Sequence, residues 1–109
     1  MDFAEYQRRS GDTAIYPDKG DNLTYPALGL GGEAGEVLEH IKKTQRDDGG
    51  VLSDERRKAL SKELGDVLWY LAQLSREAGL DLDVIAEENL AKLASRHERG
   101  VLHGSGDER

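Results

Sequence analysis

The sequence of 109 residues contains no cysteine and no long apolar run. The absence of cysteine excludes disulfide bonds and thiolate zinc sites. No hydrophobic stretch approaches the length of a membrane span, and the N-terminus lacks the pattern of a signal peptide. We therefore expect a cytoplasmic protein without a membrane partner.

Basic residues are scarce relative to acidic ones. The 15 Lys and Arg residues face 22 Asp and Glu residues, which gives a formal net charge of −7. Nonspecific nucleic-acid binding through a basic surface is therefore not expected. The length indicates one domain with a modest core, and only 37% of the residues are hydrophobic. We expect subunits to associate.

Hydrophobic periodicity predicts four helices and no strand, so the expected fold class is all-α, a four-helix bundle. Asp2, Pro26 and Ser53 are suitable helix-start residues, and Gly79 is a natural stop. The predicted helices cover approximately residues 2–10, 26–46, 54–78 and 81–98. Residues 1–100 then form a helical domain, and residues 101–109 form a Gly-rich C-terminal tail.

Two acidic pairs, Glu33-x-x-Glu36 and Glu63-x-x-Asp66, stand beside apolar stripes of the second and third helices. Residues three apart share a helix face, so each pair directs two carboxylates the same way. If the helices pack antiparallel, four carboxylates converge, and they cannot all stay ionised without a cation. Oxygen ligands suit Mg²⁺ or Mn²⁺ and indicate metal-assisted phosphate chemistry. Solvated helix faces are the competing interpretation.

Two other kinds of site do not fit the sequence. A ferritin-like di-metal site needs Glu-x-x-His on two helices, but His40 follows Glu36 by four positions. The glycines at 29, 31, 32 and 35 lack the Gly-Lys-Ser/Thr ending of a P-loop. Two interpretations of these glycines stay open. One is a late helix start with one close helix contact, and the other is close approach of a second helix or a ligand to the carboxylates.

The acidic pairs belong to longer motifs. Gly32-Glu33-Ala34-Gly35-Glu36-Val37, followed by Lys62-Glu63-Leu64-Gly65-Asp66-Val67-Leu68-Trp69-Tyr70, resembles the MazG-like all-α nucleotide pyrophosphohydrolases. The later run Asn89-x-x-Lys92-Leu93-x-x-Arg96 is similar to the fourth-helix signature of that family. The resemblance covers about residues 24 to 100.

This resemblance implies Mg²⁺-dependent hydrolysis of a nucleoside triphosphate to the monophosphate and pyrophosphate, by a homodimer or homotetramer. Glu33, Glu36, Glu63 and Asp66 match the metal-ligand positions, and Glu33 or Glu36 is the candidate that activates water. The positions expected to bind substrate are Asn89, Lys92 and Arg96. The alternative is an acidic helical protein that binds nucleotide or metal without turnover.

Several residues keep two interpretations. Trp69 either stacks on a base or fills a helix or subunit interface. Tyr25 and Leu28 are candidates for a base pocket. His40 is expected to be solvated or at an interface. The preferred base and sugar do not follow from the sequence, because partner subunits and loops contribute to their recognition.

Overall fold

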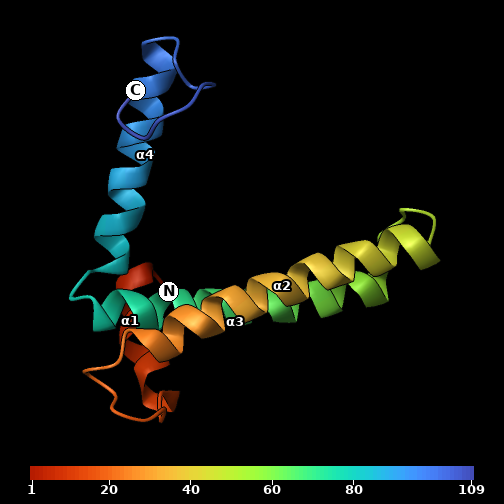
Figure 1. Cartoon of the computed structure of the whole chain (residues 1–109), viewed down its shortest axis with the longest axis horizontal. Coiled ribbons are helices and arrows are strands. Elements are labelled where there is room, and N and C mark those ends of the chain that lie inside the picture. Colours follow the sequence, from red (N-terminus) through yellow and green to blue (C-terminus); the bar gives the residue numbers. More distant parts are fainter.

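The structure is a computed structural model that describes all 109 residues, and it contains no strand (Figure 1). Its elements are α1 (Phe3–Ser10), a 3₁₀ helix η1 (Gly11–Thr13), α2 (Thr24–Asp47), α3 (Asp54–Glu77) and α4 (Leu82–Glu98). The all-α prediction is confirmed, and each α-helix ends within two residues of its predicted bounds.

Local capping explains why the helices begin where they do. The Asp2 carboxylate accepts a hydrogen bond from the Glu5 backbone N–H at 2.8 Å, and the Ser53 hydroxyl accepts one from Arg56 N–H at 3.1 Å. Both satisfy donors that a helix leaves unpaired in its first turn. Gly79 ends the α3 region with φ +70°, a conformation that costs glycine little.

The helices α2 and α3 form a long antiparallel hairpin (Figure 1). A tight loop joins them. Thr44 C=O accepts from both Asp48 N–H and Gly50 N–H at 3.1 Å, and the Arg56 guanidinium donates to Asp48 at 2.7 Å. Because the loop is short and closed on itself, residues in the middle of α2 lie against residues in the middle of α3.

The best-buried part of the chain lies where α1 meets the second half of α3. Ala72 and Gln73 are completely buried there, and Gln73 donates to the Ser10 hydroxyl at 2.8 Å. The Trp69 indole N–H donates to the Thr13 hydroxyl at 3.0 Å, so η1 is fixed to α3 as well. The core is therefore small and sits at the base of the hairpin.

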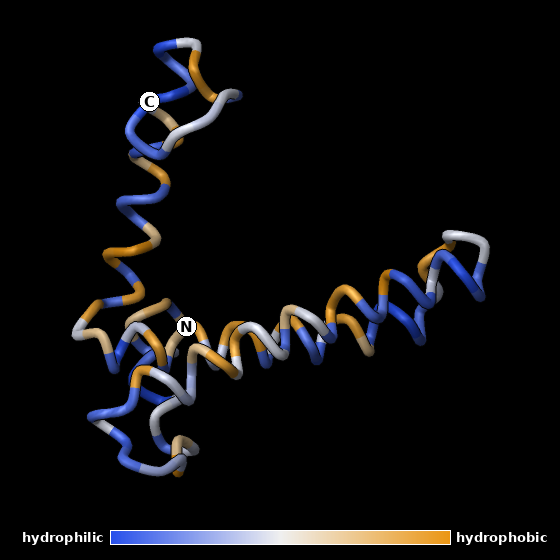
Figure 2. The backbone as a smooth tube through the Cα atoms, viewed as in Figure 1, coloured by the Kyte–Doolittle hydropathy of each residue, from blue (hydrophilic) through white to orange (hydrophobic).

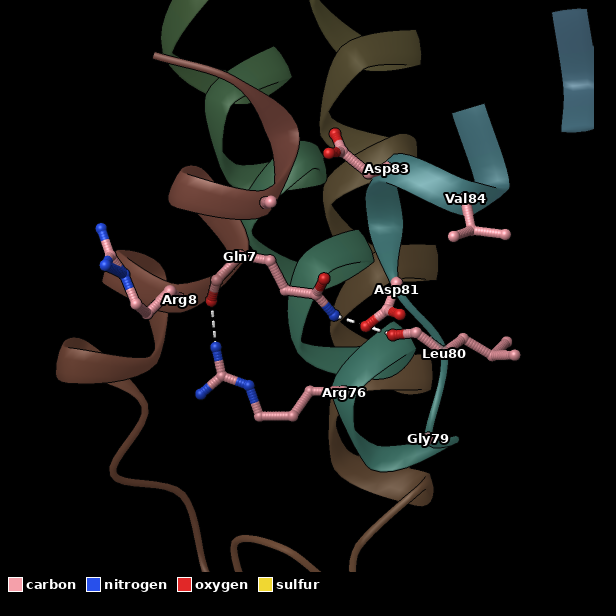
Figure 3. A pocket seen from close by; sticks show the side chains of 9 residues that line it. Gln7, Arg8, Arg76, Gly79, Leu80, Asp81, Asp83 and Val84 are labelled. Carbon is pink, nitrogen blue, oxygen red and sulfur yellow. Dashed lines mark hydrogen bonds between the residues drawn. The ribbon is translucent and has the colours of Figure 1, made fainter. Parts of the chain in front are cut away.

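The direction of α4 is set by α1. The Gln7 side chain donates to Leu80 C=O at 2.9 Å, and Arg76 donates to Gln7 C=O (Figure 3). The Gln7 side chain also accepts from Leu82 N–H at 2.9 Å. These bonds hold the turn between α3 and α4, beside an open hollow of about 800 Å³. From this turn α4 runs away from the hairpin instead of packing along it (Figure 1).

Many large apolar residues stay exposed in a single chain. Hydrophobic positions recur along both the hairpin and α4 (Figure 2). Leu28 and Leu38 on α2 are 71% and 70% exposed, and Leu90 on α4 is 69% exposed. Isolated exposed apolar residues are ordinary, but repeated ones on several helices indicate faces that another surface covers. No helix of the structure is both long enough and apolar enough to cross a membrane.

The glycines of α2 fall into two groups. All four lie inside the helix, so a late helix start is wrong. A methyl group added at Gly29 would collide with the Tyr70 ring of α3, whereas one added at Gly31, Gly32 or Gly35 would meet nothing within 4 Å. Gly29 therefore makes the close helix contact, and the other three leave open space around the first acidic pair.

Candidate active site

Three carboxylates converge between the middle of α2 and the middle of α3. Glu33, Glu63 and Asp66 each offer an oxygen atom, and these three atoms lie within 4.8 Å of one another. Glu33 and Glu63 are partly buried between the helices, and Asp66 is exposed. The predicted facing of the two acidic pairs is thus seen for three of the four residues.

The fourth acid of the motif, Glu36, lies outside this group of three and is exposed. It follows Glu33 by less than one turn, and its charge still acts on Glu33. The arrangement separates the two pairs into three converging carboxylates and one peripheral carboxylate. A peripheral carboxylate is free to bind water rather than a cation.

The pKa of Glu33 is raised above its ordinary value. Burial is the largest cause, followed by a hydrogen bond with Glu63 and the negative charges of Asp66, Glu63 and Glu36. All three effects disfavour the ionised form of Glu33. Like charges held this close indicate a site that a cation would stabilise.

The donor set fits a hard divalent cation. Mg²⁺ takes oxygen ligands at about 2.0–2.1 Å, which places neighbouring ligand oxygens about 3 Å apart. The three oxygens already lie within 4.8 Å, so small side-chain rotations suffice to bring them to one ion. Glu33, Glu63 and Asp66 would hold the ion.

Residues outside the acidic motifs complete the surroundings of the cluster. His40 of α2 lies with its Nε2 atom 3.5 Å from Glu63 Oε1, across the helix pair. α1 packs against α3, and Tyr6 of α1 has a pKa raised by burial and by the negative charge of Asp66. His40 was expected at a solvated surface or an interface, and Tyr6 has no sequence signal because only folding brings α1 against α3.

An aromatic group extends from the cluster toward the start of α2. Tyr16 and Tyr25 stack with ring centres 5.1 Å apart, and Tyr25 lies 6.3 Å from Tyr70. Trp69 packs edge-on against Tyr70 at 5.0 Å. Tyr25 is 43% exposed, so part of this aromatic surface is accessible. Trp69 is held by Thr13 within the chain, which favours a packing role for it.

The basic motif is not brought to the acids within one chain. Asn89, Lys92 and Arg96 lie on α4, which points away from the α2–α3 hairpin (Figure 1). No hydrogen bond or ion pair joins these residues to α2 or α3. Lys92 and Arg96 instead bind Asp107 of the tail, each at 3.0 Å. Asn89 is exposed.

Two comparisons connect these features to known proteins. The chain is all-α, and its acidic and basic motifs lie in the span of residues 23–101, which matches the MazG nucleotide pyrophosphohydrolase domain. The chain therefore belongs to the MazG nucleotide pyrophosphohydrolase family. It is also similar to the Gene 37 protein of Mycobacterium phage L5, with 49% identity over 95% of this chain and 96% of that protein. No solved structure matches the chain.

Proposed function

We propose that this protein hydrolyses a nucleoside or deoxynucleoside triphosphate to the monophosphate and pyrophosphate, with Mg²⁺ as its cation. The observation that supports this most is the convergence of Glu33, Glu63 and Asp66 across the α2–α3 hairpin. In a member of the MazG family, such a cluster is suited to a metal ion that serves the phosphate chain. Mn²⁺, which prefers the same oxygen ligands, is the alternative cation.

The residues have separate roles in this proposal. Bound Mg²⁺ would screen the negative charge of the phosphates from the attacking water. Glu36, or Glu33 where it is not committed to metal, accepts a proton from that water. The water oxygen forms a new bond to phosphorus as the phosphoanhydride bond to pyrophosphate breaks. Lys92 and Arg96 stabilise the charge that builds up on the departing pyrophosphate. Asn89, which lies on the same helix, binds the substrate.

The geometry of one chain suggests where the positively charged side chains of Lys92 and Arg96 act. Because α4 points away from the hairpin, its basic residues cannot serve the acids of their own chain in this arrangement. The exposed apolar residues of α2 and α4 offer a surface for a second copy. We therefore propose a homodimer or homotetramer in which α4 of one subunit supplies Lys92 and Arg96 to the carboxylates of another.

Product identity tests the proposed reaction. A panel of NTPs and dNTPs is incubated with the full chain, with and without Mg²⁺, and the products are separated by anion-exchange chromatography. The proposal expects monophosphate and pyrophosphate only when the metal is present. Diphosphate and orthophosphate as primary products would exclude a pyrophosphohydrolase. Nucleotide binding without any product would favour the alternative, a binding protein without turnover.

A further inference from the structure

The tail that follows α4 is a closed loop with a defined shape. The Arg109 guanidinium donates to the carbonyls of Val101 at 3.0 Å, Leu102 at 2.9 Å and Gly106 at 2.6 Å. Gly104 and Gly106 have φ of 148° and 89°, which side-chain-bearing residues rarely adopt. The loop is thus held by its own sequence before anything binds to it.

This loop presents one carboxylate to α4. Asp107 Oδ1 lies 3.0 Å from both Lys92 Nζ and Arg96 Nη2, and Arg96 also donates to the Asp107 carbonyl. Arg96 is only 4% exposed under the tail. The two cations hold the pKa of the Asp107 carboxyl below its usual range, Lys92 contributing first. The anion already bound by this basic pair is therefore part of the chain itself.

The contact leaves one strong donor unused. Arg96 Nε is buried and has no hydrogen-bond partner, because Asp107 engages the Nη2 nitrogen alone. Arginine binds phosphate best through two parallel N–H bonds. A phosphate group offers more acceptor oxygens than a carboxylate, so it can satisfy Arg96 Nε in addition to Nη2 and Lys92.

We propose that Asp107 is an autoinhibitory anion that occupies the Lys92–Arg96 pair in the free protein and is displaced by the phosphate groups of a ligand. The role of that ligand as substrate rests on the proposed function, whereas the anion site rests on the contacts of α4 with the tail. Every anion that binds the pair must first open the loop at Asp107. The apparent affinity of that anion is therefore its intrinsic affinity multiplied by the fraction of molecules in which the loop is open.

Neutralising Asp107 while keeping its shape tests this competition. Inorganic pyrophosphate is titrated by calorimetry into the full chain at low salt without metal, for the natural sequence, Asp107→Asn and Glu108→Gln. Glu108 is the matched control, because it is an exposed neighbour with no ion pair, and its substitution removes the same charge. We expect Asp107→Asn to bind pyrophosphate about three to ten times more tightly and Glu108→Gln to change little, because exposed ion pairs are individually weak.

The double variant Lys92→Ala/Asp107→Asn must lose this gain, because the pair that binds the anion is then incomplete. An affinity for pyrophosphate that is unchanged or weaker in Asp107→Asn would overturn the proposal and leave Asp107 a structural anchor of the tail. The two proposals fail separately. A tighter pyrophosphate complex in a protein that cleaves no nucleotide removes the enzyme and keeps the autoinhibitory contact. Nucleotide cleavage together with an unchanged pyrophosphate affinity in Asp107→Asn keeps the enzyme and removes the autoinhibitory contact.

Discussion

Glu63 lies between like charges and an imidazole, and its substitution is the most direct test of the metal site. It belongs to the cluster with Glu33 and Asp66, and His40 approaches it at 3.5 Å. Glu63→Gln keeps the shape but removes one ligand charge. We expect Mg²⁺ affinity to fall by at least about tenfold, since even outer partners of metal ligands have effects of that size. Calorimetric Mg²⁺ titration measures it.

The same variant is expected to keep or slightly increase stability without metal. Removing one of three crowded carboxylates relieves repulsion, which is worth on the order of 1 kcal/mol or more at such distances. Glu88→Gln on α4 is the control, because Glu88 is exposed and makes no ion pair. Unchanged Mg²⁺ binding in Glu63→Gln would remove Glu63 from the site. Urea unfolding of both variants separates a lost ligand from a damaged fold.

Glu77 fixes the loop before α2, and this contact should depend on pH. Its carboxylate accepts hydrogen bonds from the Tyr16 hydroxyl, from Gly20 N–H at 2.8 Å and from Asn22 N–H at 3.2 Å. These bonds lower the pKa of Glu77, the Tyr16 bond most, while burial and this bond raise the pKa of Tyr16 to about 12. A lowered carboxyl pKa stabilises the fold above the unfolded-state pKa, and this contribution is lost as the pH falls through the folded-state pKa.

Glu77→Gln should therefore lower the free energy of unfolding at pH 7 by about 1.5–3 kcal/mol, the usual range for hydrogen bonds to a charged group. The difference from the natural chain should shrink as the pH falls from the ordinary glutamate pKa of 4.5 through the lower folded-state pKa, because Glu77 is protonated in both states only below that lower value. Urea titrations at several pH values measure both effects. A difference that stays constant down to acid pH would show that the charge of Glu77 is not involved.

At the scale of elements, local signals predict the helices, and long-range contacts decide their arrangement. The helix boundaries at Asp2, Ser53 and Gly79 were predictable from the sequence, because helix caps depend on neighbouring residues alone. The direction of α4 depends on Gln7, whose side chain bonds to Leu80 and Leu82 more than seventy positions later. No periodicity in the sequence contains that information, so the separation of the basic motif from the acids was not predictable.

The α2–α3 contact at Gly29 gives a prediction of its own. A methyl group there would meet the Tyr70 ring, whereas one at Gly31 would meet nothing within 4 Å. Gly29→Ala should destabilise the fold by about 1–3 kcal/mol through overpacking. Gly31→Ala should instead stabilise it by up to about 1 kcal/mol, because alanine is the better helix former. Thermal unfolding compares the two, and equal effects would contradict the close contact at Gly29.

At the scale of the whole molecule, the separation of acids and bases makes the site depend on assembly. The hydrophobic residues that are buried in one chain are few: Ala14, Tyr16, Ala72 and Leu82. Light scattering at micromolar concentration should therefore give at least the mass of a dimer. A fully active monomer would contradict this expectation and would require α4 to fold back onto its own hairpin.

Mixing two inactive variants tests whether the site is shared. Glu63→Gln damages the acidic cluster and Lys92→Ala damages the basic motif, and we expect each alone to lose most of its activity. If a dimer joins the acidic cluster of one subunit to α4 of the other, a mixed dimer contains one intact site. The Lys92→Ala subunit supplies its undamaged acidic cluster to that site, and the Glu63→Gln subunit supplies its undamaged Lys92 and Arg96. Random exchange of equal amounts then restores about a quarter of all sites.

If both motifs act within one chain, every site keeps one defect and mixing restores nothing. Activity measured after co-refolding of the two variants distinguishes these outcomes, and two natural chains refolded together give the reference for full recovery.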